Sequence, residues 1–246
     1  MSVKTEGWNI LDTGINSAEE NMRIDTELLE NLDENSQPTL HLYDWKNDSA
    51  TYGYFVDPFD FLSKEGVEKH KLDLARRPTG GGIIFHMWDF AFSLVVPSHS
   101  RHFSQNTLDN YAFVNNAVLR ASQEFLETEE KLEIIPDDFT PVDMSCKRFC
   151  MAQPTKYDVV LNGRKIAGAA QRKTKQGFLH QGTISLMMPP KEYLQEILLK
   201  DTEVVDAMFA NTFALMGPNA KIHDLDSSRK KIKQILTKYL TREIQK

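Results

Sequence analysis

The chain has 246 residues, of which 29 are basic and 35 acidic, so its formal net charge is −6. A hydrophobic content of 41% and a charged content of 26% are those of a folded globular protein with one large core, which excludes a disordered chain. The sequence has no apolar run near the roughly 20 residues that span a bilayer and no apolar amino-terminal signal, and its acidic balance disfavours a general nucleic-acid binder. We therefore expect a cytoplasmic protein that binds neither membrane nor nucleic acid.

The first half of the chain predicts strands that alternate with helices. Ser17 and Glu20 form a capping box at the start of a helix over 18–32, whose inward residues include Met22 and Leu29, together with Leu32. A second helix is predicted over 63–70. Runs with strand composition cover residues 8–11, 38–43, 51–56, 72–76, 83–85 and 90–96.

The second half begins with a long helical pattern over 105–127. A hairpin is predicted from strands 157–161 and 164–168, because Asn162-Gly163 tolerates the positive φ angles of a type I′ turn. The remaining predictions are a strand over 178–186 and helices over 190–199, 203–213 and 227–244. The sequence contains no linker or repeat, so we expect a single α+β domain over 1–246, with mixed, mostly antiparallel sheets packed against helices and no carboxy-terminal accessory domain.

A run of three glycines, Gly80, Gly81 and Gly82, joins two predicted strands directly after Arg76 and Arg77. Glycines let the backbone approach a ligand closely, with N–H groups free for anionic oxygens, and arginine offers forked donors suited to phosphate or carboxylate. The spacing is neither that of a P-loop nor that of a dinucleotide-binding fingerprint. A flexible hairpin with solvated arginines is the alternative interpretation.

A second cluster lies on and around the predicted hairpin. Lys165 could stabilise negative charge on a carbonyl or phosphoryl oxygen, with Gly168 leaving room beside it, or it could be a solvated charge at a sheet edge. Cys150 is either a small buried side chain or a reactive thiolate with Lys165 as its cation. His180 alone would be structural. Cys146 and Cys150 lack the further ligands of a metal site, so we expect free thiols and no metal.

Three motifs occur in order along the chain. They are the helix Ser17-Ala-Glu-Glu-Asn-Met-Arg-Ile-Asp25, the R-R-x-x-G-G-G-x-x-x-H loop that ends at His86, and the G-x-K-x-[AS]-G-x-A-Q segment from Gly163 to Gln171. With these motifs the chain resembles the lipoate–protein ligase A and octanoyltransferase family, which shares its catalytic fold with class II biotin ligases. The likeness covers most of the sequence. Biotin ligase activity is a weaker alternative.

The resemblance implies attachment of a lipoyl or octanoyl group to a lysine of lipoyl domains in 2-oxoacid dehydrogenase complexes or of the glycine-cleavage H protein. It makes Lys165 a catalytic residue in contact with the acyl carbonyl and the activated phosphate. The residues that the resemblance assigns to acyl or adenylate binding are Arg77, Gly80, Gly81, Gly82, Ile83, Ile84, Phe85, His86, Asp158, Gly168, Ala170, His180 and Gly182.

The family uses two activation chemistries. Cysteine octanoyltransferases take the acyl group from a donor such as an acyl carrier protein, and Cys150 resembles their nucleophile in C-x-x-x-P-[ST]-x-[YW]-[DE]. Ligases instead form an acyl-adenylate from lipoate, ATP and Mg²⁺, and Gly82 and the 173–183 stretch are similar to theirs. We favour the thioester at Cys150 slightly. Met87 replaces the family's aspartate after the histidine, which leaves a non-catalytic lipoate-binding protein as a third reading.

A basic face would help this acidic protein to dock on acidic lipoyl domains. The basic residues near the expected site in sequence are Lys147, Arg164, Arg172, Lys173 and Lys175. They form either a docking face or a solvated charged hairpin.

Overall fold

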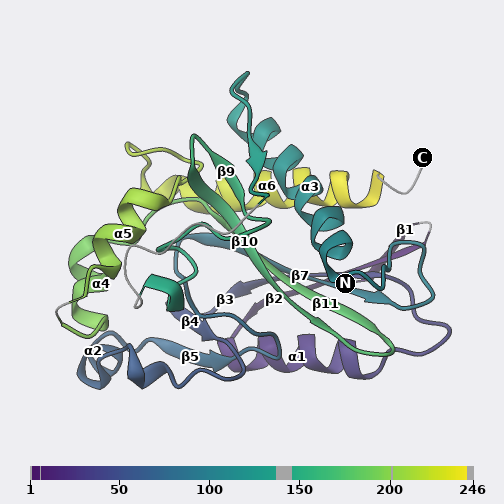
Figure 1. Ribbon diagram of the computed structural model, residues 1–246, viewed down its shortest axis with the longest axis horizontal. Coiled ribbons are helices and arrows are strands. Elements are labelled where there is room, and N and C mark those ends of the chain that lie inside the picture. Colours follow the sequence, from purple (N-terminus) through teal and green to yellow (C-terminus); the bar gives the residue numbers. More distant parts are fainter. Residues whose placement is uncertain (1, 6, 137–145, 201, 243–246) are drawn as a thin grey trace.

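The computed structural model describes residues 2–5, 7–136, 146–200 and 202–242, and these contain two β-sheets (Figure 1). The larger sheet has the strand order β1-β2-β3-β7-β11-β10-β9-β8, and the smaller has the order β5-β4-β6. The strands of the larger sheet are β1 (Ser2–Thr5), β2 (Trp8–Asn16), β3 (Thr39–Trp45), β7 (Asp89–Pro97), β8 (Glu133–Ile134), β9 (Val159–Leu161), β10 (Arg164–Lys173) and β11 (Gly177–Ser185). Those of the smaller sheet are β4 (Ser49–Tyr52), β5 (Asp73–Arg76) and β6 (Ile83–His86).

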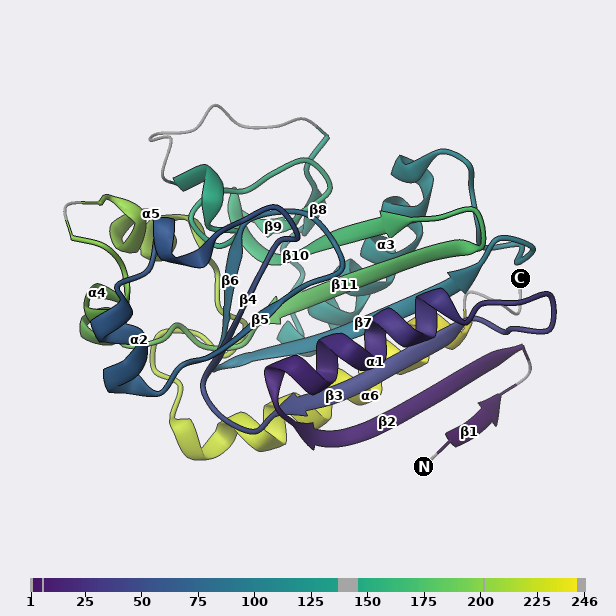
Figure 2. The same ribbon diagram turned by 90° about the horizontal axis from the view of Figure 1, so that it is seen from below.

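Helices cover both faces of the larger sheet. Figures 1 and 2 show α1 (Ala18–Glu30) on one face and α3 (Thr107–Leu126) with α6 (Leu225–Arg242) on the other. The main core lies between the sheet and α3 and α6, where Phe92, Phe178 and Ile232 are fully buried. A second core joins the smaller sheet to α4 (Lys191–Ile197) and α5 (Val204–Asn211), while α2 (Lys64–His70) follows that sheet's strand β4. Among the described residues, no helix has the length and apolarity needed to cross a bilayer.

The expected class, a mixed and mostly antiparallel α+β fold, is confirmed. The pair β2–β3 is parallel, and the other pairs of the larger sheet are antiparallel. The strand expected over 51–56 is displaced, because β4 ends at Tyr52 and the chain turns at Gly53, whose carbonyl accepts from the N–H of Val56. Strands β1 and β8 were not predicted. Residues 243 and 244 of the last expected helix lie outside the described residues.

The capping box at the start of α1 is only half formed. The Ser17 hydroxyl accepts from the N–H of Glu20 at 3.2 Å, as expected, but the Glu20 carboxylate binds Arg23 instead of returning to Ser17. Met22 and Leu29 are buried, as predicted. Two polar side chains that the pattern did not single out, Asn21 and Asp25, are also fully buried on this helix.

The predicted hairpin is confirmed at its turn. Asn162 and Gly163 have φ angles of 51° and 75°, which both belong to a type I′ connection between β9 and β10. Strand β10 is ten residues long and continues well past the expected end at Gly168. It pairs with β11, and β11 pairs with β7, so the residues after the hairpin become a central part of the sheet.

Candidate active site

A pocket of about 670 Å³ lies where β6, β10, β11 and the 146–155 segment meet. It brings the two sequence clusters together, as the motifs required. The predicted residues that line it are Arg77, Gly81, Gly82, Ile84, His86, Cys150, Lys165, Gly168, Ala170 and Gly182. The predicted residues that do not line it are Gly80, Ile83, Phe85, Asp158 and His180.

Lys165 forms an ion pair inside the protein. Its Nζ lies 2.7 Å from Oδ2 of Asp158, and the two side chains are 6% and 4% exposed. The same oxygen of Asp158 accepts from the N–H and the hydroxyl of Thr155, at 2.7 and 2.9 Å. Burial raises the pKa of Asp158, while Lys165 and Thr155 act in the opposite direction. The reading of Lys165 as a solvated edge charge is therefore wrong, and Asp158 belongs to the site as the partner of Lys165.

Gly168 makes space for this pair, as expected. A Cβ at this position would lie 2.5 Å from both Cε and Nζ of Lys165 and 2.8 Å from Oδ1 of Asp158. The Lys165 backbone is held from the other side, where its carbonyl accepts from the N–H of Phe213 at 2.8 Å. The glycine thus allows an ammonium group and a carboxylate to lie directly against the strand.

The glycine loop is held by Arg77 rather than being flexible. Nη1 of Arg77 donates to the carbonyl and hydroxyl oxygens of Thr51, at 2.8 and 2.9 Å. Nη2 donates to the carbonyl oxygens of Gly80 and Gly82, at 3.1 and 2.8 Å. Arg77 is 5% exposed, so it is not a solvated arginine, and both of its Nη groups are engaged by oxygens of the protein. Only Arg76 of the arginine pair is exposed.

The loop still offers the anion-binding groups that its composition predicted. Within the described residues, the N–H groups of Gly80, Gly81 and Gly82 donate to no backbone or side-chain oxygen. Gly81 has a φ of 93° and lines the pocket. Gly53 packs so closely on the loop that a Cβ there would collide with the carbonyl oxygen of Gly81.

Gly82 explains how Cys150 reaches the pocket. A Cβ on Gly82 would collide with the backbone carbonyl of Arg148, so the 146–152 segment packs directly on this glycine. The N–H of Cys150 then donates to the carbonyl of Ile83 at 3.0 Å. Cys150 is half-buried, Cys146 is buried and lines the same pocket, and neither forms a disulfide.

The cation beside Cys150 is Arg77, whereas the sequence had suggested Lys165. Charge attraction and hydrogen bonding from the Cys150 side chain raise the pKa of Arg77, although burial lowers that pKa more strongly. Within the described residues, the oxygen atoms that accept from Arg77 are all neutral, and its Nε–H has no hydrogen-bond partner. A buried guanidinium without a carboxylate favours an anion nearby. A thiolate at Cys150 would supply one.

Strand β6 divides its residues between the pocket and the second core. Ile84 and His86 line the pocket, while Ile83 and Phe85 belong to the hydrophobic core. Successive side chains of a strand point to opposite faces, so a continuous run of site residues was not possible here. Ile83 and Phe85 therefore do not line the pocket, and their assignment to ligand binding stays a prediction.

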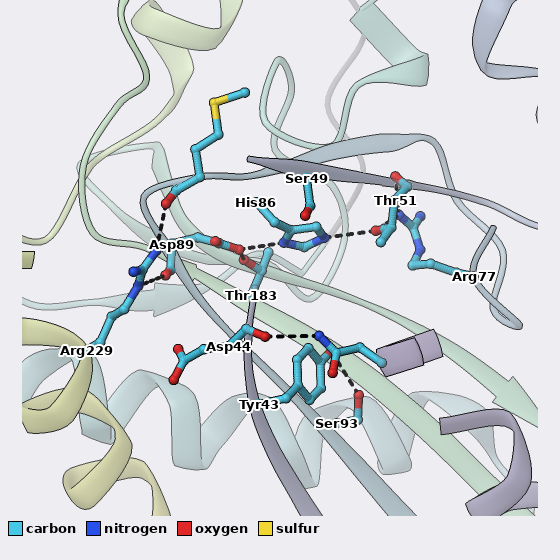
Figure 3. A network of polar contacts seen from close by, with 12 residues as sticks. Tyr43, Asp44, Ser49, Thr51, Arg77, His86, Asp89, Ser93, Thr183 and Arg229 are labelled. Atoms are coloured by element: carbon cyan, nitrogen blue, oxygen red, sulfur yellow. Dashed lines mark hydrogen bonds and ion pairs between the residues drawn. The ribbon is translucent and has the colours of Figure 1, made fainter. Parts of the chain in front are cut away.

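His86 lies in a chain of buried hydrogen bonds (Figure 3). Its Nδ1 lies 2.7 Å from Oδ2 of Asp89, and its Nε2 lies 2.9 Å from the hydroxyl of Thr51. Its ring stacks on Trp45, with 4.2 Å between the centroids. Met87, which stands in place of the family's aspartate, is buried in the second core. Asp89, which lies two positions after Met87, gives His86 a carboxylate partner.

His180 is a structural residue and does not reach the pocket. It is fully buried, and its Nδ1 lies 2.8 Å from the side-chain nitrogen of Gln171. Its ring stacks on Phe92. Burial lowers the pKa of His180 to about 3, so the imidazole is neutral in the folded protein. His180 is not among the residues that line the pocket, and its assignment to acyl or adenylate binding stays a prediction.

The sequence did not single out a second buried network around Asp25. This carboxylate is fully buried and accepts from His41 at 2.8 Å, Ser93 at 2.6 Å and Gln181 at 2.7 Å. Gln181 lines the pocket and accepts from the hydroxyl of Thr79 at 2.7 Å. The helix motif ending at Asp25 was the only sequence signal for this network.

The basic residues do not form one docking face. Arg164 and Lys173 stand at opposite ends of the ten-residue strand β10, which at about 3.3 Å per residue places them roughly 30 Å apart. Arg164 is also engaged with the carbonyls of Phe209 and Thr212. Lys147 alone of the five lines the pocket, next to Arg148.

Comparisons with known proteins agree with this geometry. Residues 17–239 match the model of the lipoyl protein ligase A/B catalytic domain. An octanoyltransferase LipM from Halalkalibacterium halodurans is 26% identical over 238 residues, covering 93% of this chain and 84% of the relative. The octanoyltransferase LipM of Bacillus subtilis is 25% identical over 218 residues, covering 85% of this chain and 76% of the relative.

Solved structures show the same fold. A bipartite lipoate protein ligase from Thermoplasma acidophilum, studied with its E2 lipoyl domain, superposes with a TM-score of 0.67 at 19% identity, covering 94% of this chain and 83% of the other. A lipoate-protein ligase A bound with ATP superposes with a TM-score of 0.66 at 18% identity, covering 94% of this chain and 93% of the other.

Proposed function

The chain belongs to the lipoyl protein ligase A/B catalytic-domain family, and we propose that it transfers an octanoyl group through a thioester on Cys150 to the lysine of a lipoyl domain. Membership of this family makes it a protein lipoylation enzyme, an acyltransferase or ligase. The relatives named octanoyltransferase LipM support the thioester route.

The observation that carries the proposal is the buried Arg77 guanidinium beside Cys150. A thiolate, not a thiol, is the nucleophile, and a neighbouring cation without its own carboxylate favours the thiolate. Arg77 meets this condition among the described residues, whereas the charge of Lys165 is balanced by Asp158 at 2.7 Å.

The transfer then takes two balanced steps. The Cys150 sulfur attacks the carbonyl carbon of an acyl thioester, an S–C bond forms, and the donor's thiolate leaves and takes up a proton. The acceptor's amine next attacks the carbonyl of the Cys150 thioester, so an amide bond forms, the amine loses a proton and the Cys150 thiolate is released. In both steps negative charge develops on the carbonyl oxygen. The unengaged N–H groups of the glycine loop and the Lys165 ammonium are the hydrogen-bond donors available to stabilise this charge.

Intact-mass analysis after incubation with octanoyl-carrier protein tests the proposal. We expect one octanoyl adduct that hydroxylamine removes, that is absent in Cys150→Ser, and that passes to an apo lipoyl domain. Cys146→Ser is the matched control, since both thiols line the pocket, and it should keep the adduct. An adduct that persists in Cys150→Ser, or full acyl transfer by that variant, would overturn the proposal.

A ligase acting on lipoate and ATP with Mg²⁺ is the second candidate. It is favoured by the loop N–H groups of Gly80 to Gly82, which remain available for phosphate oxygens. Lipoate-dependent release of pyrophosphate, retained in Cys150→Ser, would select this route. Acyl transfer from octanoyl-carrier protein without ATP would show that this transfer does not need the adenylate route.

A further inference from the structure

We propose that His86 and Asp89 are positioning residues that set the direction of the Thr51 hydroxyl and thereby hold the Arg77 guanidinium against Cys150. The inference rests on the proposed function, in which Cys150 is the nucleophile. It assigns a role to buried residues that the transfer steps themselves do not use.

The contacts form one continuous chain through the protein (Figure 3). Oδ2 of Asp89 lies 2.7 Å from Nδ1 of His86, and Nε2 of His86 lies 2.9 Å from the Thr51 hydroxyl. That hydroxyl lies 2.9 Å from Nη1 of Arg77, whose side chain interacts with Cys150. Thr51, Arg77, His86 and Asp89 are all buried, at no more than 6% exposure.

The direction of each hydrogen bond in this chain follows from its ends. An ionised carboxylate only accepts, so Nδ1 of His86 carries the proton and donates to Asp89. In the neutral imidazole Nε2 is then an acceptor, and it accepts a hydrogen bond from the Thr51 hydroxyl. The lone pairs of that hydroxyl are left for Arg77, which can only donate. The opposite tautomer of His86 would turn the Thr51 proton towards Arg77 and weaken this contact.

Other charges near Cys150 do not replace Arg77. The cations that line the pocket are Lys147, Arg148, Lys165 and Arg77. Lys165 is paired with Asp158, and Lys147 and Arg148 are exposed, where water screens their charge. Among the described residues that line the pocket, Arg77 is therefore the buried cation without a carboxylate partner.

The protein contains a second series of hydrogen bonds of the same kind, and this series serves as a matched control. Nδ1 of His41 lies 2.8 Å from Oδ1 of Asp25, and Nε2 of His41 lies 2.9 Å from the hydroxyl of Thr13. His41 and Asp25 are as deeply buried as His86 and Asp89. Among the described contacts, Thr13 makes none with Arg77.

The test measures the reactivity of Cys150 in the absence of any acyl donor. The rate of Cys150 alkylation by iodoacetamide at pH 7, followed by peptide mass analysis to separate it from Cys146, reports the thiolate fraction. We expect Thr51→Val and Asp89→Asn to slow alkylation about tenfold, because a displaced guanidinium would stabilise the thiolate nucleophile less. Thr51→Ser, which keeps the hydroxyl, should restore the wild-type rate, and Thr13→Val and His41→Gln should not change it.

Two results would overturn the inference. One is an unchanged alkylation rate of Cys150 in Thr51→Val. The other is an equal reduction of that rate in Thr13→Val, which would attribute the reduction in Thr51→Val to a general loss of stability. Nitrogen NMR of the unaltered protein gives a reading that needs no variant: His86 should carry its proton on Nδ1, and a proton on Nε2 would refute the scheme. If Cys150→Ser still transfers acyl groups while the alkylation rates follow the expected order, the proposed function fails and the positioning role stands.

Discussion

Lys165 and Asp158 form an ion pair across the predicted hairpin, with 2.7 Å between Nζ and Oδ2 and with both side chains buried. Seven positions separate them in sequence, and the tight turn at Asn162 and Gly163 folds one strand back on the other. A local turn thus places the two charges of the site beside each other.

Replacing Asp158 by Asn should destabilise the protein strongly. Loss of one partner from a buried ion pair leaves an uncompensated charge and costs about 3–5 kcal/mol. Chemical denaturation measures the change in the free energy of unfolding. Asp206→Asn, which removes the partner of Lys191 from an exposed pair, is the control and should cost under about 1 kcal/mol. Equal costs for the two variants would show that burial of the Lys165 pair is energetically unimportant.

Gly168→Ala should impair acyl transfer. The new methyl group would lie 2.5 Å from the Lys165 ammonium and 2.8 Å from Oδ1 of Asp158, so the buried pair would have to shift. Misplacing a reacting group by about 1 Å can reduce turnover about 100-fold. Steady-state kinetics with a lipoyl-domain acceptor measures kcat, and thermal denaturation checks the fold. A fully active Gly168→Ala protein would contradict a role for the position of Lys165.

The glycines of the loop should differ in their tolerance of alanine. Gly82→Ala would collide with the backbone of Arg148 and should displace the segment that bears Cys150, with a stability loss of about 1–3 kcal/mol. Gly80→Ala meets no atom within 4 Å and is the control. Denaturant midpoints and Cys150 alkylation rates report the two effects. A destabilised Gly80→Ala protein beside an unaffected Gly82→Ala protein would refute this packing.

Stability should decrease in acid because of His180. Burial lowers its pKa to about 3, whereas a histidine of the unfolded chain titrates near about 6.5. Stability from this group is complete above the unfolded pKa, and it is lost as the pH falls towards the folded pKa, since only the unfolded state takes up the proton. From pH 7 to pH 5 the loss is about 2 kcal/mol.

His180→Gln isolates that contribution. Its free energy of unfolding should fall by about 2 kcal/mol less than that of the wild type between pH 7 and pH 5. His223→Gln, at a site with a 70% exposed side chain, should behave like the wild type. Parallel pH dependence of His180→Gln and wild type would mean that His180 is protonated in the folded protein.

The cations at the pocket should matter for protein-bound donors. Charge reversal at Lys147 and Arg148 should raise the KM for octanoyl-carrier protein, about tenfold at low salt, and leave a small octanoyl thioester unaffected. Reversal of Lys173 and Lys175 at the far end of the β10–β11 hairpin is the control. Equal increases in KM for the two double variants would support the single basic face that the sequence had suggested.

Local patterns predicted much of this architecture. The hairpin turn, the start of α1 at Ser17 and the long helix α3 follow from residues that are neighbours in sequence. The shared pocket of Cys150 and Lys165 with the glycine loop followed from the order of the motifs. Alternation along β6 also follows from the sequence, and it places Ile83 and Phe85 in the core, away from the pocket.

The parts that escaped prediction depend on long-range contacts. Arg77 interacts with Cys150 and donates a hydrogen bond to Thr51, so these contacts join three segments that are distant in sequence. Asp89 contacts His86 only because the chain after β6 turns back on that histidine. Burial of His180 depends on Phe92 and Gln171, from two other strands.

The strand order of the larger sheet also bears on how the protein folds. Strand β11 pairs with β7, which lies some 90 residues earlier in the chain, and β7 pairs with the still earlier β3. Such high contact order makes closure of these pairs the slow step of folding, since long loops must be ordered before any contact rewards them. We therefore expect acyl-transfer activity to return only in the last refolding phase, after most of the helical circular-dichroism signal.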